Sequence, residues 1–107
     1  MTAQQLIPEE LLNSVVAHFD PQRVIVFGSV ARGEAGPDSD IDLVVVLDDN
    51  TPLEMLGAQS VYEARKNYAS AVDILPCRAS VLNEQARAKG SFADTVLREG
   101  VTVYERR

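Results

Sequence analysis

One stretch of the sequence, residues 24–47, constrains what this chain can fold into. It contains two runs of β-prone apolar residues, VIVF and LVVVL, and the residues between them are mostly small, polar or turn-forming. The first run ends at Gly28-Ser29, and the second run follows Asp40 and Asp42. Such runs are typical of buried strands, and the Gly-Pro-Asp triplet between them is a turn signal. The stretch therefore predicts a strand, a short helix, a turn and a second strand.

Periodic apolar residues and turn signals divide the rest of the chain into alternating helices and strands. Helices are predicted at residues 8–19, 30–33, 52–66, 80–89 and 92–99, and strands at 23–27, 41–47, 71–75 and 101–104. The third strand should end before Pro76, because proline cannot donate a ladder hydrogen bond. This alternation predicts an α/β (α+β) fold in one domain of 107 residues.

The order of the elements also predicts how the strands pair. A long helix separates the strands at 41–47 and 71–75, so these two strands should be parallel. The first strand should run antiparallel to the second if the Gly-Ser turn is to meet the aspartates. The unbroken apolar run in the second strand indicates a central position, covered on both faces. We therefore expect a mixed sheet flanked by helices.

Net charge and composition exclude some classes of function. The chain carries a formal net charge of −6 and a single cysteine, Cys77. A general nucleic-acid-binding protein usually shows a basic face, which an acidic chain with scattered Lys and Arg does not favour. No apolar run approaches the ~20 residues of a membrane span, and the N-terminus lacks the basic start of a signal peptide. We expect a cytoplasmic protein with no membrane segment and no internal disulfide.

Asp40, Asp42 and Asp73 are the candidate catalytic and metal-binding residues. Alternate residues of a strand point to one face, so Asp40 and Asp42 should lie side by side, about 6–7 Å apart along the strand. Asp73 interrupts the apolar run AVDIL and, in a buried run, would need a partner. Three clustered carboxylates repel one another, and a divalent cation relieves this repulsion. Because no histidine or thiol cluster accompanies them, Mg²⁺ or Mn²⁺ is favoured over Zn²⁺.

A carboxylate cluster of this kind suits phosphoryl or nucleotidyl transfer. Two ions about 3.5–4 Å apart could stabilise both the attacking and the leaving oxygen of an in-line displacement. Asp40 and Asp42 would bridge the two ions. Asp73 would hold the ion nearest the attacking hydroxyl and could accept its proton.

Gly28, Ser29 and Arg32 are the candidate phosphate-binding residues. Glycine lets the backbone approach a triphosphate closely, and the start of the following helix offers free N–H groups. The serine hydroxyl can bond a phosphate oxygen, and the arginine can neutralise phosphate charge. A P-loop is excluded, because Glu34 and Ala35 stand where that motif requires lysine and a hydroxyl residue.

Each feature has a simpler interpretation when it is taken alone. A glycine–serine turn is common, and an isolated Asp-x-Asp before a strand would normally be a polar turn. Asp73 could be paired with an arginine instead of a metal ion. Their combination favours a functional site over the separate interpretations.

The stretch GSVARGEAGPDSDIDLVVVL resembles the signature of the nucleotidyltransferase superfamily that includes DNA polymerase beta. In that signature a Gly-Ser pair is followed, after ten residues, by Asp-x-Asp. With GSVARG and SDIDLVV the chain is similar, more closely, to the minimal nucleotidyltransferases of prokaryotes, which are the antitoxins of HEPN–MNT toxin–antitoxin pairs. The resemblance is strong over residues 24–47, extends to Asp73 and reaches the final EGVTVYE more loosely.

The resemblance implies a nucleotidyltransferase fold that uses ATP and two Mg²⁺ ions. It assigns Gly28 and Ser29 to the triphosphate, and Asp40, Asp42 and Asp73 to the metal ions. It further implies transfer of AMP to a tyrosine hydroxyl of a cognate HEPN ribonuclease toxin, which silences the toxin. No signature position departs from the pattern.

Two other functions remain open from the sequence. The chain could neutralise a toxin by binding it stoichiometrically, without catalysis. It could also be a nucleotidyltransferase subunit that acts on a small molecule or an RNA end held by a separate chain. Little sequence follows the predicted catalytic core, so the acceptor groove is expected to come from a second polypeptide, a homodimer or the target itself.

Overall fold

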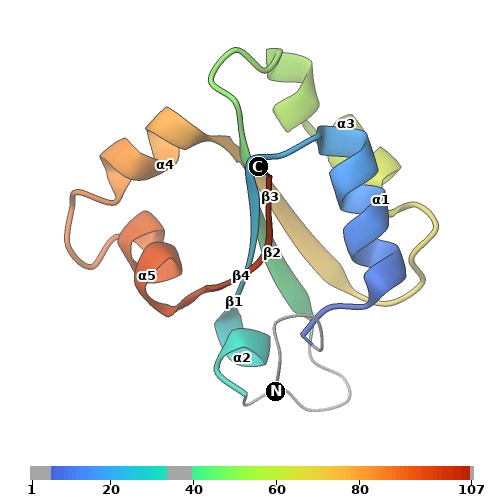
Figure 1. The fold of residues 1–107 in the computed structure, drawn as a ribbon, viewed down its shortest axis with the longest axis horizontal. Helices are drawn as coiled ribbons and strands as arrows, with labels where there is room; N and C mark the ends of the chain where they lie inside the picture. The colour runs from blue at the N-terminus through green and yellow to red at the C-terminus, as the bar shows by residue number, and fades with distance from the viewer. Residues whose placement is uncertain (1–5, 34–39, 107) are drawn as a thin grey trace.

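The computed structural model describes residues 6–33 and 40–106. These residues form a four-stranded sheet that lies between two layers of helices (Figure 1). Helices α1 and α3 cover one face of the sheet, and α4 and α5 cover the other (Figure 1). In chain order the elements are α1 (Glu9–Phe19), β1 (Arg23–Phe27), α2 (Gly28–Ala31), β2 (Ile41–Leu47), η2 (Leu53–Leu56, a 3₁₀ helix), α3 (Ala58–Arg65), β3 (Val72–Arg78), α4 (Ala79–Gln85), α5 (Phe92–Glu99) and β4 (Val101–Glu105).

Strand β2 is a central strand whose two neighbours run in opposite directions. The strand order is β3-β2-β1-β4. β2 pairs antiparallel with β1 and parallel with β3, and β4 pairs antiparallel with the other side of β1. Every residue of β2 from Leu43 to Leu47 is buried. The predicted mixed sheet, its strand directions and the buried central strand are therefore confirmed.

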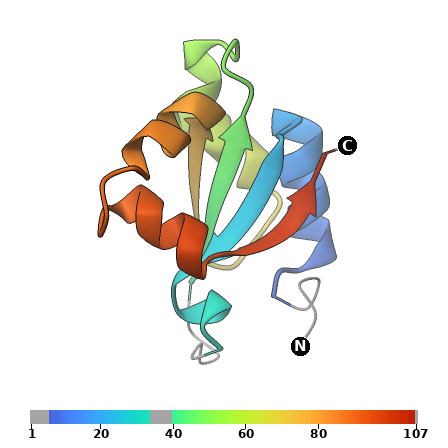
Figure 2. The same cartoon turned by 60° about the vertical axis from the view of Figure 1, so that its left-hand side comes forward.

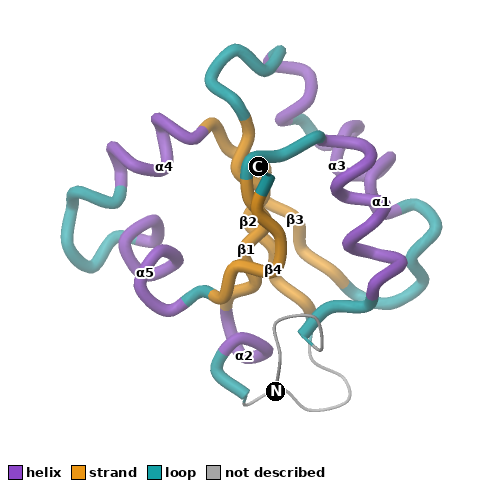
Figure 3. The backbone as a smooth tube through the Cα atoms, viewed as in Figure 1, coloured by secondary structure: helices purple, strands orange, loops and turns teal. Residues whose placement is uncertain are grey.

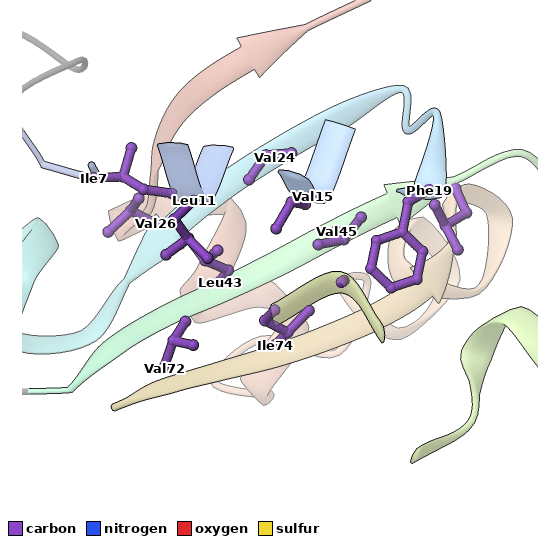
Figure 4. Packing of buried hydrophobic residues seen from close by; sticks show 12 residues of the cluster. Ile7, Leu11, Val15, Phe19, Val24, Val26, Leu43, Val45, Val72 and Ile74 are labelled. Atoms are coloured by element: carbon purple, nitrogen blue, oxygen red, sulfur yellow. The ribbon is translucent and has the colours of Figure 1, made fainter. Parts of the chain in front are cut away.

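Alternate residues of the strands supply two hydrophobic clusters, one beneath each helix layer. Val24 and Val26 of β1 join the first cluster, whereas Ile25 between them joins the second. The first cluster consists of Ile7, Leu11, Val15, Phe19, Val24, Val26, Leu43, Val45, Leu47, Ala64, Val72 and Ile74 (Figure 4). The second cluster consists of Ile25, Val44, Val46, Leu82, Ala93 and Val96.

The predicted continuous helix at residues 52–66 is wrong, because the chain breaks at Gly57. The 3₁₀ helix η2 ends just before this glycine, and α3 begins just after it. Gly57 itself is extended, with φ −89° and ψ 174°. Glycine costs an α-helix about 1 kcal/mol relative to alanine, and the break lets Met55, Leu56 and Val61 all pack against the first cluster. Tertiary packing therefore overrides the apolar periodicity.

The prediction that the third strand stops before Pro76 is also wrong. β3 continues through this proline to Arg78, with Pro76 opposite Val45 of β2. The N–H of Ile41 donates to the carbonyl of Ala71, at 3.4 Å, so the odd-numbered residues of β3 direct their backbone groups to β2. Pro76 therefore faces the free edge of an edge strand, where its missing N–H costs no ladder hydrogen bond.

Two helix boundaries differ from the predictions as well. α2 begins at Gly28 instead of residue 30, so it follows β1 directly. α4 ends at Gln85 instead of residue 89, and the Ser91 hydroxyl donates to the Gln85 carbonyl at 3.0 Å. The same Ser91 oxygen accepts the Asp94 N–H at 3.1 Å and caps α5. Within residues 6–33 and 40–106, no helix has the length and apolarity that a membrane crossing needs.

Gly100 joins α5 to β4 in a space that excludes any side chain. An added Cβ would lie 2.5 Å from the Val96 carbonyl oxygen and 2.5 Å from Ile25 Cγ2. We expect Gly100→Ala to lower the free energy of unfolding by about 1–3 kcal/mol, the usual cost of overpacking. Urea denaturation would measure this loss. Gly57→Ala is the matched control, because its Cβ would meet only an ordinary contact at 3.5 Å, and equal losses for the two variants would contradict the prediction.

Candidate active site

The candidate active site lies at the end of the sheet where β2 and β3 begin and β1 runs into α2 (Figure 2). Asp42 is the second residue of β2, and its partners in the flanking strands are Phe27 and Asp73. Directly opposed residues of paired strands project to the same face. Phe27, Asp42 and Asp73 therefore form one row across three strands, on the same face as the second cluster. Helices α4 and α5 lie on that side of the sheet (Figure 3).

The three predicted carboxylates differ in exposure. Asp42 is half-buried in the central strand, whereas Asp40 and Asp73 are exposed. The expectation of a buried run around Asp73 is wrong, because β3 is an edge strand on which Asp73 and Leu75 stay exposed, although α4 and α5 lie on the same side of the sheet. Val72 and Ile74 turn into the first cluster, while Asp73 and Leu75 alternate with them on the open side. The exposed carboxylate of Asp73 therefore needs no buried arginine as a partner.

Burial and neighbouring acids raise the pKa of Asp42. The largest cause is partial desolvation, which disfavours the charged form. The charges of Asp73 and Asp40 and a hydrogen bond with Asp73 raise the pKa further. The structure thus brings Asp42 and Asp73 into contact and keeps Asp40 near enough to repel Asp42. A cation bound among these groups would remove the conflict.

Gly28 is required both by its backbone conformation and by the closeness of Asp42. Its φ of +76° lies in the left-handed region that side chains rarely adopt. A Cβ added at this position would lie 2.6 Å from Asp42 Oδ2. The turn that starts α2 therefore packs directly against the central carboxylate, so a phosphate chain near this turn would lie beside Asp42.

Ser29 and Arg32, the other two predicted phosphate-binding residues, have fewer described contacts than Gly28. The backbone of Ser29 belongs to α2, but its side chain lies outside the described part of the structure. Arg32 is exposed in the turn after α2, and its N–H donates to the Gly28 carbonyl at 3.2 Å. Contacts of Ser29 and Arg32 with phosphate stay predictions.

A pocket of about 500 Å³ opens beside the row of Phe27, Asp42 and Asp73. Ligand sites in proteins commonly have volumes of about 300–1,000 Å³. Apart from that row, it is lined by Val61, Arg65, Val72, Ile74, Leu75 and Phe92. Sequence reasoning missed Leu75 and Phe92. The alternation in AVDIL could have placed Leu75 on the face of Asp73, but no local signal connects Phe92 to the site.

The chain also contains a thiol and an imidazole, and neither belongs to this site. Burial raises the pKa of the Cys77 thiol to about 11, which makes it a poor nucleophile at neutral pH. The ring of His18 shares a hydrogen bond of 2.8 Å with the Ser60 hydroxyl, which joins α1 to α3. Asp42 and Asp73 are therefore the acidic groups that this pocket offers, and Arg65 is its basic group.

Comparison with known families decides the class of protein. The family described as nucleotidyltransferase domain matches residues 8–99, which run from the start of α1 to the end of α5. This chain belongs to the nucleotidyltransferase domain family. It is therefore a transferase, and the fold expected from the Gly-Ser and Asp-x-Asp stretch is confirmed.

Relatives and solved structures agree with this nucleotidyltransferase fold. A protein of Methanocaldococcus jannaschii, named "Putative protein adenylyltransferase MJ0141", is 33% identical over 81 residues, which are 76% of this chain and 77% of the relative. A crystal structure of a "putative nucleotidyltransferase" from Sulfolobus solfataricus superposes with a TM-score of 0.59 and 23% identity, covering 95% of this chain and 79% of that one. A crystal structure described as a toxin–antitoxin with AMP-PNP has a TM-score of 0.56 and 20% identity, covering 94% and 76%.

Members of this family are expected to use a divalent cation, and the residues present fit one in part. Asp42 and Asp73 supply hard oxygen donors that repel one another in the absence of a cation. Within residues 6–33 and 40–106, however, no three acidic, histidine or cysteine side chains are close enough together to hold an ion. The metal-binding roles of Asp40, Asp42 and Asp73 therefore stay predictions.

The crowded carboxylates of this nucleotidyltransferase are expected to lower its free energy of unfolding at neutral pH. Because folding raises the pKa of Asp42 above its usual 3.8, the folded state is favoured at acid pH and loses that advantage as the pH rises. We expect Asp42→Asn to raise the melting temperature of the metal-free protein near neutral pH and to change it less at about pH 4. Thermal unfolding followed by circular dichroism, with EDTA present, would measure both values. A variant that melts below the wild type at neutral pH would contradict this account.

Proposed function

We propose that this nucleotidyltransferase is a Mg²⁺-dependent protein adenylyltransferase that transfers AMP from ATP to a hydroxyl, a tyrosine of a HEPN ribonuclease toxin, and so acts as an antitoxin. The observation that carries the proposal is the row in which Asp42 and Asp73 meet beside the Gly28 turn. This arrangement supplies acidic groups next to a turn that a phosphate chain can approach. The relative named as a protein adenylyltransferase supports a protein acceptor.

Each predicted site residue has a task in the proposed reaction. The backbone at Gly28, with Ser29 and Arg32, binds the phosphates, and Asp40, Asp42 and Asp73 would hold Mg²⁺. When bound, Mg²⁺ supplies positive charge that neutralises the phosphates and the developing charge on the leaving group. The acceptor oxygen forms a bond to the α-phosphorus while the bond from that phosphorus to pyrophosphate breaks. Asp73, exposed at the edge strand, accepts the proton of the acceptor hydroxyl.

An open site supports a macromolecular acceptor. Asp73 and Leu75 lie on the open face of β3, so a hydroxyl on another protein can reach them without a domain movement. One of the solved structures with a similar fold is described as a toxin–antitoxin with AMP-PNP. The net charge of −6 also suits a basic partner such as a ribonuclease.

Intact mass spectrometry of the partner tests the proposal directly. The chain would be purified with its natural binding partner, incubated with Mg²⁺ and ATP, and the partner weighed. We expect a gain of one or more AMP units with the wild type and none with Asp42→Asn, which should remain folded. Peptide mapping would then locate the modified residue, and a tyrosine is expected.

Two results would redirect the assignment. An unchanged partner mass in a tight complex, with toxin activity blocked without ATP, would favour stoichiometric neutralisation. Transfer to a small molecule or an RNA end, but not to the partner, would instead favour a nucleotidyltransferase subunit with a separate substrate-binding chain. Retained transfer by a folded Asp42→Asn variant would contradict the role given to that carboxylate.

A further inference from the structure

The exposed ring of Phe92 lines the same pocket as the carboxylates of Asp42 and Asp73, and the proposed reaction gives this ring no role. Phe92, the first residue of α5, is 55% exposed although it lines the pocket. Its ring packs edge-to-face on Phe27, with centroids 5.2 Å apart and planes at 84°. An edge-to-face contact covers only part of a ring. The remaining surface of Phe92 is therefore available to a ligand in the pocket.

The row across the sheet places Phe27, the partner of this ring, at the end opposite Asp73. Phe27, on β1, is followed directly by the Gly28 turn, whereas Asp73 lies on the far side of Asp42, on the outer strand. In the proposed reaction the phosphates lie near Gly28 and the acceptor hydroxyl lies near Asp73. Phe27, with the ring of Phe92 that packs on it, thus lies at the Gly28 end of the row, and the pocket that both rings line extends from there to Asp73.

We propose that the exposed ring of Phe92 stacks against the nucleobase of the bound nucleoside triphosphate and supplies part of its binding energy. This inference rests on the proposed function, because it needs the triphosphate to lie at the Gly28 turn. Phe92 and Asp42 both line the pocket of about 500 Å³, a volume within the usual range of ligand sites. Stacking on a ring recognises any flat base, so Phe92 strengthens nucleotide binding without selecting adenine by hydrogen bonds.

Calorimetric titration of the full chain with two magnesium-bound probes tests the role of Phe92. One probe is AMP-CPP, a non-hydrolysable ATP analogue, and the other is inorganic tripolyphosphate, which has the phosphates but no base. We expect Phe92→Ala to weaken AMP-CPP binding roughly tenfold, the usual scale for loss of one stacking ring, and to leave tripolyphosphate binding unchanged. Phe92→Tyr, which keeps the ring, should bind AMP-CPP like the wild type.

Tyr62→Ala is the matched control, because Tyr62 is another aromatic residue, 59% exposed, that does not line the pocket. It should bind both probes like the wild type. Equal loss of both probes by Phe92→Ala would show deformation of the phosphate site and would overturn the proposal. Unchanged AMP-CPP binding by Phe92→Ala would overturn the proposal as well. This includes the case in which Phe92→Ala raises only the KM for the acceptor. A wild-type protein that binds neither probe would contradict the proposed function itself.

Discussion

The antiparallel pairing of β1 with β2 is the constraint on which the rest of the site depends. Phe27 at the end of β1 lies opposite Asp42 at the start of β2, so the chain enters the Gly28 turn beside that carboxylate. A Cβ at Gly28 would lie 2.6 Å from Asp42 Oδ2, which leaves no room for a side chain. One pairing register therefore brings the Gly28 turn, which is proposed to bind phosphate, next to an acid, although ten residues separate Ser29 from Asp40.

The parallel pairing of β2 with β3 places like charges side by side, where they oppose folding. Asp42 is half-buried, and the carboxylates of Asp73 and Asp40 raise its pKa further. The hydrophobic clusters on both faces of the sheet stabilise the arrangement, since β2 is fully buried from Leu43 onward. Residues that a protein keeps despite such a cost are typical of functional sites. The electrostatic strain at Asp42 and the proposed chemistry thus have one origin.

Local sequence patterns predicted much of the fold, and they failed where packing decided. The strands at 23–27 and 41–47 and the helix at 92–99 occur as expected, because apolar runs and caps act over a few residues. The predicted helix at 52–66 is interrupted at Gly57, because the break lets residues before and after this glycine pack against the first cluster. The predicted end of the third strand before Pro76 is wrong, because Pro76 faces the free edge of the sheet. Which strand lies at the edge is decided by the strand order and not by the local sequence.

The sequence by itself determined the chemical groups of the site, because the Gly28-Ser29 pair and the Asp40-x-Asp42 motif lie close together in the chain and Asp73 interrupts its own apolar run. Tertiary structure decided their surroundings. It made Asp73 exposed and Asp42 half-buried, and it brought Phe92, fifty residues beyond Asp42, into the pocket wall. Exposure and long-range contacts depend on strand order and helix packing, which join residues far apart in the chain and leave no local pattern from which they could be read.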